Sequence, residues 1–167
     1  MLVEVRTDAG AVGVGEIAGG PQKQICDLVA QFGQAIRGMD ARDPDGVRSR
    51  LLSLTVPRPG GLGGWDGLPA PLPRNLRPQA MAAMGGIDIA LWDVKGKAAG
   101  MPVYRLLGGT RREVFTYVVG GFYVENAPLL ACADEFAGYA AQGFRAVKLK
   151  TGALSLADEV RRIDAVR

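Results

Sequence analysis

The chain has 167 residues, of which 48% are hydrophobic and 22% are charged, and its net charge of +3 comes from 20 basic and 17 acidic residues. This composition is ordinary for a globular protein, and the length suits one domain or one domain and a piece of a second. No run of like charge suggests nucleic acid, no apolar run reaches the ~20 residues of a membrane-spanning helix, and the N-terminus lacks a signal-peptide layout. We therefore expect a cytoplasmic protein that binds neither nucleic acid nor a membrane.

The first 36 residues predict a β-hairpin followed by a helix. Apolar and polar residues alternate over 2–7 and again over 11–17, and Asp8-Ala9-Gly10 between them is a turn signal. The glycine-rich residues 18–20 form a loop, after which Pro21 suits the first position of a helix. Apolar residues then recur at helical spacing: Ile25, Leu28, Val29, Phe32 and Ile36.

A second helix and an irregular segment follow. Asp43-Pro44 is a helix start signal, and the helix carries Val47, Leu51 and Leu54. Residues 57–73 are rich in proline and glycine and contain Trp65 and Asp66. Such a segment is either a mobile lid or a plain connection. The order β-β-α-α so far is typical of an α+β arrangement.

The longest predicted element is a helix from Pro78 to Ala99, which Gly100 ends. Asp88 and Asp93 on it are five residues apart, a poor spacing for ligands of one metal site, so we expect structural roles for both. The predicted buried stripe consists of Met81, Met84, Ile87, Leu91, Val94 and Ala98.

From Val114 onward the pattern alternates between strands and helices. We expect a strand over 114–119, a helix over 128–142, a strand around 146–150 and a helix that starts with the capping-box sequence at Ser155. This order implies that the two strands pair in parallel, as at the start of either a (β/α)-barrel or a doubly wound sheet. The turn at 120–123 (GGFY) lacks the dinucleotide fingerprint. The predicted inner residues of the two helices are Leu129, Ala133, Phe136 and Ala140, then Leu156, Val160 and Ile163.

The two cysteines, Cys26 and Cys132, lie in apolar helical patterns far apart in the sequence. We therefore expect buried free thiols in a reducing compartment, and neither a disulfide nor a metal pair.

The strand around 146–150 carries two lysines on one face. Its period of two places Lys148 and Lys150 together and Val147 and Leu149 on the opposite face. Two enclosed ammonium groups disfavour each other's charged form, which yields a proton-abstracting amine in a chain without histidine. Lysines alternating with aliphatic residues also fit an ordinary strand with one solvated face. In a barrel, catalytic groups lie at the carboxyl ends of the strands, where this pair stands, and both interpretations remain open.

Three segments resemble the mandelate racemase/muconate lactonizing enzyme family of the enolase superfamily. Residues 86–97 (GIDIALWDVKGK), continuing through 100–109 (GMPVYRLLGG), resemble its long-helix signature. Residues 7–16 (TDAGAVGVGE) resemble its capping-domain hairpin, and residues 146–150 (AVKLK) resemble the Lys-x-Lys motif on its second barrel strand. The matches stand in the right order and cover essentially the whole chain.

The resemblance implies an α+β capping domain over 1–110, with its first strand missing, followed by the first two βα units of a (β/α) TIM-type barrel over 111–167. It implies Mg²⁺-assisted removal of the proton α to a carboxylate, leading to racemisation, cycloisomerisation or dehydration. Lysine-base chemistry with Mg²⁺ is a known pattern of enolase-superfamily sites. By position, Lys150 would be the base, Lys148 would assist it and contact the substrate carboxylate, and Ile17 and Ala18 would lie in a specificity loop.

The departures from the family pattern limit what this chain is expected to do. The family's carboxylate metal ligands lie on the third, fourth and fifth barrel strands, beyond Arg167. We therefore expect a fragment that binds no Mg²⁺ and is inactive alone, from a homo-oligomeric enzyme acting on a small carboxylate such as an acid sugar. The alternatives are a non-catalytic remnant or assembly module that docks on a partner chain, and a doubly wound binding domain.

Overall fold

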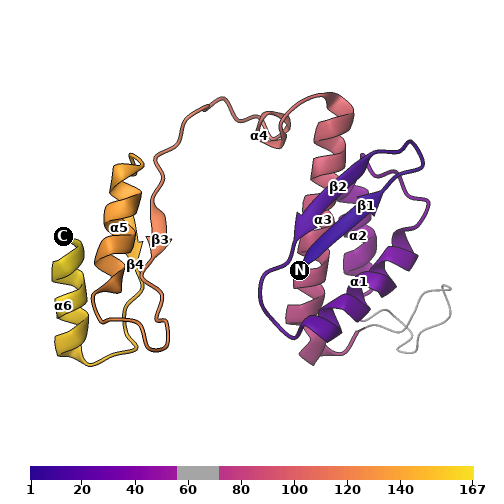
Figure 1. Cartoon of the computed structure of the whole chain (residues 1–167). Coiled ribbons are helices and arrows are strands. Elements are labelled where there is room, and N and C mark those ends of the chain that lie inside the picture. The colour runs from indigo at the N-terminus through magenta and orange to yellow at the C-terminus, as the bar shows by residue number, and fades with distance from the viewer. Residues whose placement is uncertain (56–71) are drawn as a thin grey trace. The chain divides into compact units, whose positions relative to one another are not determined.

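The computed structural model of the chain describes residues 1–55 and 72–167. It divides into an N-terminal unit, Met1–Thr110, and a C-terminal unit, Arg111–Arg167 (Figure 1). Most of the predicted irregular segment 57–73, including Trp65 and Asp66, lies outside the described residues. Within the described part of the chain, no helix is both long and apolar enough to cross a membrane.

The N-terminal unit begins with the predicted antiparallel hairpin. Strand β1 (Leu2–Arg6) pairs with β2 (Val12–Glu16). The turn between them is closed by Thr7, whose Oγ1 accepts a hydrogen bond from the Ala11 N–H at 3.0 Å. Gly10 in this turn has a φ of 82°, a conformation that glycine adopts without steric cost.

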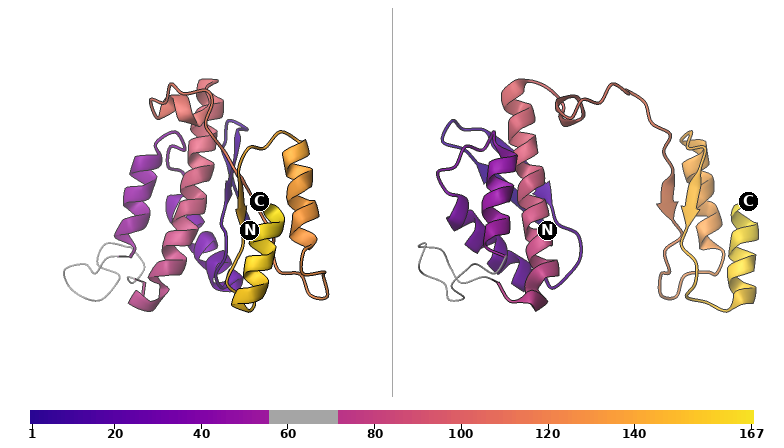
Figure 2. Two further views of the ribbon diagram at one scale, coloured as in Figure 1. Left: turned by 90° about the vertical axis from the view of Figure 1, so that its left-hand side faces the viewer. Right: turned by 180° about the vertical axis from the view of Figure 1, so that it is seen from behind.

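Helix α3 (Arg77–Ala99) is the longest element and lies along the hairpin (Figure 2). Two glycines of β2 make this approach possible. A Cβ atom on Gly13 would lie 2.0 Å from the carbonyl oxygen of Ala90, and one on Gly15 would lie 1.9 Å from that of Gly86. The strand and helix backbones are therefore in direct contact, with no space for a side chain between them.

The buried face of α3 is wider than the predicted stripe. The predicted Met84, Ile87, Leu91 and Val94 are buried, whereas Met81 is 56% exposed and Ala98 is exposed. Small residues widen the face because α3 contacts the hairpin as well as two helices. Met81 lies outside this face, and Ala98 lies in the last turn of the helix. The remaining buried positions are Ala80, Ala83, Gly86, Ala90 and Gly96.

Helices α1 (Gln22–Ile36) and α2 (Pro44–Ser53) both pack on α3. Asp43 begins α2 by accepting a hydrogen bond from the Gly46 N–H at 3.0 Å, the expected arrangement for an N-terminal cap. A short 3₁₀ helix, η1 (Arg74–Leu76), leads into α3, and α4 (Val103–Leu106) follows it. Together with Leu54, the residue after α2, these two helices supply the following core residues: Ile25, Leu28, Phe32, Val47 and Leu51.

The expectation of two buried thiols is half wrong. Cys132 is buried, but Cys26 is exposed, and both are free. Cys26 follows the buried Ile25 by one residue, and a step of about 100° around the helix takes it off the buried stripe.

The C-terminal unit is a β-α-β-α segment. Strand β3 (Val118–Gly120) and strand β4 (Val147–Leu149) pair in parallel and are connected through helix α5 (Ala131–Ala141). Helix α6 (Leu156–Val166) follows β4 and contacts α5. The order of elements and the parallel pairing are those that the sequence predicts.

The first strand and helix of this unit are shorter than predicted. In place of a strand over 114–119, β3 covers Val118–Gly120, and Val114 and Phe115 are 72% and 78% exposed. The hydrogen-bonded strand is limited to the residues that face β4. Helix α5 begins at Ala131 and not at residue 128. Of its predicted inner residues, Phe136 is buried, Leu129 and Ala133 are half-buried, and Ala140 is exposed.

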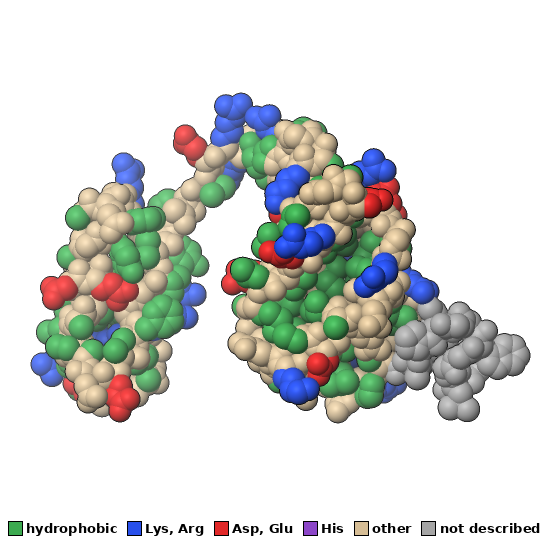
Figure 3. Space-filling view, turned by 45° about the vertical axis from the view of Figure 1, so that its right-hand side comes forward, with side chains coloured by type: hydrophobic (Ala, Val, Ile, Leu, Met, Phe, Trp, Pro, Cys, Tyr) green, Lys and Arg blue, Asp and Glu red, His purple; other side chains and the backbone are tan. Residues whose placement is uncertain are grey.

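The predicted inner face of α6 is wrong. Leu156, Val160 and Ile163 are 82%, 47% and 37% exposed, and the buried residues of the helix are Glu159 and Arg162. Hydrophobic side chains accordingly reach the surface of this unit (Figure 3). The charged residues take the inner position because they bind backbone groups at the ends of β3 and β4, as described below.

Candidate active site

Lys148 and Lys150 stand at the carboxyl end of β4. Lys148 is paired in register with Val119 of β3. Lys150 follows the last strand residue, and its backbone N–H donates to the Gly120 carbonyl oxygen at 3.1 Å. Both lysines are thus held by the parallel pair at the strand ends where the sequence places them.

The two lysines lie on the face of the pair that α5 does not cover. Leu149 between them packs toward α5, since a Cβ atom on Gly121 would lie 2.2 Å from Leu149 Cδ1 and 3.4 Å from Cys132 Cβ. Successive side chains of a strand point to opposite faces, so Lys148 and Lys150 share the other face. In a complete barrel of this topology, the face away from the helices is the interior.

Both lysine side chains are exposed in this structure. The Lys150 Nζ lies 5.5 Å from the centroid of the Phe122 ring, which belongs to the loop after β3. The described residues therefore supply one aromatic neighbour but not the enclosure that would make the amine a base. The catalytic role of the pair stays a prediction.

Behind the strand ends lies a buried cluster that the sequence analysis missed. Glu159 and Arg162 of α6 are 7% and 3% exposed, and they pair with each other at 3.3 Å. Tyr123, from the loop after β3, donates its hydroxyl hydrogen bond to the Glu159 carboxylate. In the sequence the pair looks like an ordinary i, i+3 ion pair on a helix surface. The only signal that it lies near the strand ends is its position directly after the capping box that follows the lysine strand.

Hydrogen bonds hold the pKa of Glu159 at about 2, well below its usual 4.5. The bond from Tyr123 is the main cause, and backbone N–H groups of residues 152–154 add to it. A carboxyl whose pKa is depressed by folding stabilises the folded state above its unfolded pKa, and this stabilisation is lost as the pH falls towards the folded value.

We therefore expect the stability of the C-terminal unit to decline between about pH 4.5 and about pH 2. The variant Glu159→Gln is expected to be less stable than the parent chain near neutral pH, with the difference shrinking as the pH falls through this window. Amide hydrogen exchange of residues 111–167 at several pH values measures it. Glu125→Gln, an exposed change in the same unit, is the control. A difference that stays constant with pH would contradict the assignment.

The predicted specificity loop lies in the N-terminal unit. Ile17 is 4% exposed and belongs to the core, where its side chain packs against Gly86, whereas Ala18 is exposed. Gly19 and Gly20 continue the loop with φ values of 74° and 78°. The core contact of Ile17 thus anchors the start of an exposed loop, and a substrate contact by Ile17 or Ala18 stays a prediction.

Asp88 and Asp93 of α3 have different surroundings. Asp93 Oδ2 accepts hydrogen bonds from the Val14 N–H at 2.8 Å and from Lys97 Nζ at 2.7 Å, and these bonds lower its pKa. It therefore ties β2 to α3, which is the structural role that the sequence favours. Burial raises the pKa of Asp88, and the nearby Arg48 opposes that effect.

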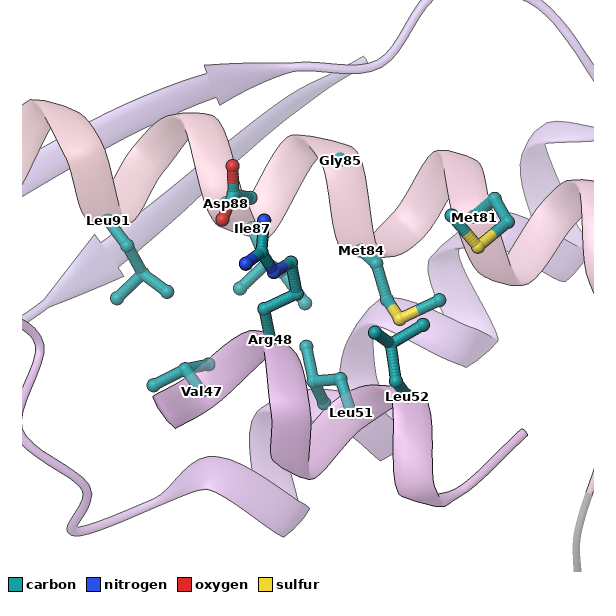
Figure 4. A pocket seen from close by; sticks show the side chains of 10 residues that line it. All are labelled: Val47, Arg48, Leu51, Leu52, Met81, Met84, Gly85, Ile87, Asp88 and Leu91. Carbon is teal, nitrogen blue, oxygen red and sulfur yellow. The ribbon is translucent and has the colours of Figure 1, made fainter. Parts of the chain in front are cut away.

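A small apolar pocket of about 160 Å³ lies between α2 and α3 (Figure 4). Its wall is aliphatic except for Arg48 and Asp88 at its edge, and it holds no pair of groups suited to proton transfer. The lining side chains are Val47, Leu51 and Leu52 from α2 and Met81, Met84, Ile87 and Leu91 from α3. The strand ends of the C-terminal unit are therefore the better candidate for chemistry.

The residues at hand do not fit a magnesium site. Mg²⁺ needs several oxygen ligands in octahedral geometry. Residues 1–55 and 72–167 contain no group of three or more His, Cys, Asp or Glu side chains that could hold a metal ion.

Known proteins share the fold of the whole chain. A crystal structure of a member of the enolase superfamily from Polaromonas sp. JS666 matches 99% of this chain, with a TM-score of 0.74 and 33% identity. L-talarate/galactarate dehydratase from Salmonella typhimurium LT2, liganded with Mg and L-lyxarohydroxamate, also matches 99% of the chain, with a TM-score of 0.75 and 28% identity. The matches cover 40% and 38% of those chains. Fold and similarity together define a protein of the enolase superfamily.

The sequence comparisons narrow this class. D-galactarolactone cycloisomerase from Agrobacterium fabrum is 34% identical over all of this chain and 40% of its own length. Residues 1–108 match the family model described as "Mandelate racemase / muconate lactonizing enzyme, N-terminal domain". The chain belongs to the mandelate racemase/muconate lactonizing enzyme family and spans about two fifths of the length of these relatives.

This membership confirms the predicted fold class. The N-terminal unit is the α+β capping domain, and the C-terminal unit holds the first two βα units of a (β/α)-barrel. The alternative of a doubly wound binding domain is thereby wrong. The relatives include acid-sugar dehydratases and cycloisomerases of the enolase superfamily.

Proposed function

We propose that residues 1–167 belong to an enolase-superfamily enzyme that removes the proton α to the carboxylate of an acid sugar. The position of Lys150 is the observation that carries the proposal. Lys150 directly follows β4, the second barrel strand, on the face that α5 does not cover. The acid-sugar enzymes among the relatives support the substrate class.

In this proposal the neutral amine of Lys150 takes the proton. The C–H bond breaks, its electron pair delocalises into the carboxylate to give an enolate, and the proton moves to Nζ to give an ammonium group. Lys148, on the same face, contacts the substrate carboxylate. Ile17 and Ala18 belong to the loop that would contribute substrate specificity.

Magnesium dependence is part of the proposal and rests on the family resemblance and on the Mg in the talarate/galactarate dehydratase structure. The ion would supply positive charge for the developing enolate. Its ligands would come from outside residues 1–167, since the family places them on later barrel strands. Racemisation, cycloisomerisation and dehydration share the proton-abstraction step, and the proposal commits to that shared step.

The proposal predicts a difference between the full-length protein and residues 1–167 alone. With Mg²⁺ and a panel of acid sugars that includes galactarate and L-talarate, we expect the full-length protein to exchange the α-proton with deuterated solvent. Residues 1–167 alone are expected to give no exchange above the background rate. Proton NMR of the substrate measures both. Robust exchange by residues 1–167, or none by the full-length protein with any sugar of the panel, would contradict the proposal.

The second candidate is an assembly module that docks on a partner chain, and the exposed apolar residues of the C-terminal unit favour it. Leu156, Val114 and Phe115 are more than 70% exposed, as is unusual for side chains of this type. In the main proposal, further βα units of the same polypeptide cover these residues. Light scattering of residues 1–167 tests the module, because a well-behaved monomer would disfavour it.

A further inference from the structure

The buried pair Glu159–Arg162 links the two segments that follow the barrel strands. Charged side chains are rarely this buried unless they are paired and hydrogen-bonded. The inner position of the helix is taken by this pair although an apolar stripe is available about 100° around the helix. The contacts of the pair therefore have to offset the lost hydrophobic burial.

Glu159 organises the loop after β4. Its Oε1 accepts hydrogen bonds from the backbone N–H groups of Gly152, Ala153 and Leu154, at 2.9, 3.1 and 3.0 Å. The Tyr123 hydroxyl, from the loop after β3, donates to the same oxygen. One carboxylate thus fixes the backbone that begins two residues after Lys150 and ties it to the neighbouring loop.

Arg162 holds the strand ends themselves. Its Nη1 donates to the Lys150 carbonyl oxygen at 3.2 Å, and its Nη2 donates to the Gly121 carbonyl oxygen at 2.6 Å. The guanidinium carbon lies 4.4 Å from the centroid of the Tyr123 ring, a cation–π contact. A planar guanidinium that bonds both strand ends fixes their spacing as a flexible side chain would not.

The direction of the Lys150 side chain follows from its backbone. The N–H of Lys150 is bound to Gly120 and its carbonyl oxygen to Arg162, so both peptide groups of the residue are fixed. With the backbone held on both sides, the Cα–Cβ direction of Lys150 is set, and its side chain reaches a position where Nζ lies 5.5 Å from the centroid of the Phe122 ring. Misplacement of a reacting group by about 1 Å can lower a rate by about 10²-fold.

We propose that Glu159 and Arg162 are positioning residues that hold Lys150 at the angle its proton transfer requires. The inference rests on the proposed function, and neither residue is assigned contact with the substrate. The buried pair acts through the Lys150 carbonyl, the loop at 152–154 and the Tyr123 ring.

The test uses the full-length protein with Mg²⁺ and the acid sugar of the panel that exchanges fastest. Arg162→Met is expected to lower kcat for α-proton exchange by about 10–100-fold with KM little changed, since the substrate contacts remain. Arg162→Lys keeps one cationic donor and is expected to recover part of kcat. Arg161→Met, an exposed arginine on the same helix, is the matched control and is expected to behave like the parent.

A second readout does not depend on turnover. Glu159→Gln and Arg162→Lys are expected to speed amide hydrogen exchange at residues 152–154 by at least about tenfold. The first change replaces the charged acceptor of these N–H groups with a neutral amide, and the second weakens the ion pair that holds that acceptor in place. Arg161→Met is expected to leave this exchange unchanged. This readout keeps the test valid if Arg162→Met fails to fold.

The inference is overturned if the folded Arg162 variants keep the parent kcat, or if kcat falls equally in Arg161→Met. It is also overturned if residues 152–154 exchange at the parent rate in Glu159→Gln and Arg162→Lys. Failure of the proposed function has a different signature, because Lys150→Ala would then keep the parent rate of α-proton exchange.

Discussion

Replacing Lys150 with alanine in the full-length protein is expected to lower the rate of α-proton exchange by about 10²–10⁴-fold, the usual contribution of a general base. On the proposed function, the loss follows because the Lys150 amine accepts the proton and no other group of the two βα units is assigned to that step. The side chain is exposed and its backbone contacts remain, so the melting temperature is expected to stay close to that of the parent. Proton NMR in deuterated solvent measures the rate.

Arg145→Ala is the matched control for this change, because Arg145 is another exposed cation five residues before Lys150. It is expected to keep the parent rate. Lys148→Ala is expected to raise KM as well as lower kcat, since Lys148 is assigned to the substrate carboxylate. Lys150→Ala with the parent rate of exchange would remove Lys150 from the role of base.

Replacing Gly15 with alanine is expected to destabilise the N-terminal unit by about 3 kcal/mol or more, as severe overpacking does. The added Cβ would lie 1.9 Å from the Gly86 carbonyl oxygen and 2.9 Å from its carbonyl carbon. Both are backbone atoms, so no change of rotamer relieves the contact, and β2 or α3 has to move. Thermal unfolding of the 167-residue chain, followed by circular dichroism, measures the loss.

Gly85→Ala is the control. Gly85 is also in α3, next to Gly86, whose carbonyl group the added Cβ on Gly15 would meet. A Cβ on Gly85 meets no atom within 4 Å among the described residues, and the site is exposed. Because alanine favours the helix interior over glycine, we expect a gain of about 0.5–1 kcal/mol. If Gly15→Ala unfolds at the parent temperature, the direct contact between strand and helix backbones is wrong.

The capping domain is largely predictable from its sequence because its elements carry clear periodicities. The alternation over 2–17 and the helical spacing of Ile25, Leu28 and Phe32 place the hairpin and α1 correctly. The sequence alone does not indicate that the glycines of β2 are contact points. A glycine in a strand pattern can serve a turn, a bulge or a close approach, and only the neighbouring helix decides among these.

The orientation of α6 was not predictable from periodicity. The stripe of Leu156, Val160 and Ile163 is the best apolar face of the helix, and burying it would be favourable if a partner were present. Among the described residues, α6 lies beside α5 and beside backbone N–H and C=O groups at the strand ends, and Glu159 and Arg162 bind those backbone groups. Unpaired backbone groups do not leave a signal in side-chain hydrophobicity.

The candidate site was predictable in part. The alternation around Lys148 and Lys150 gives their shared face, and the resemblance gives the family. The positioning contacts were not predictable, because they join Arg162 to carbonyl groups of residues 12 and 41 positions away.

The most direct test of the account is a crystal structure of the full-length protein with Mg²⁺ and the acid sugar that exchanges fastest. We expect Lys150 Nζ to lie about 3–3.5 Å from the proton-bearing carbon, the separation of a group ready to react. A structure in which another side chain occupies that position, with Lys150 directed into solvent, would contradict it.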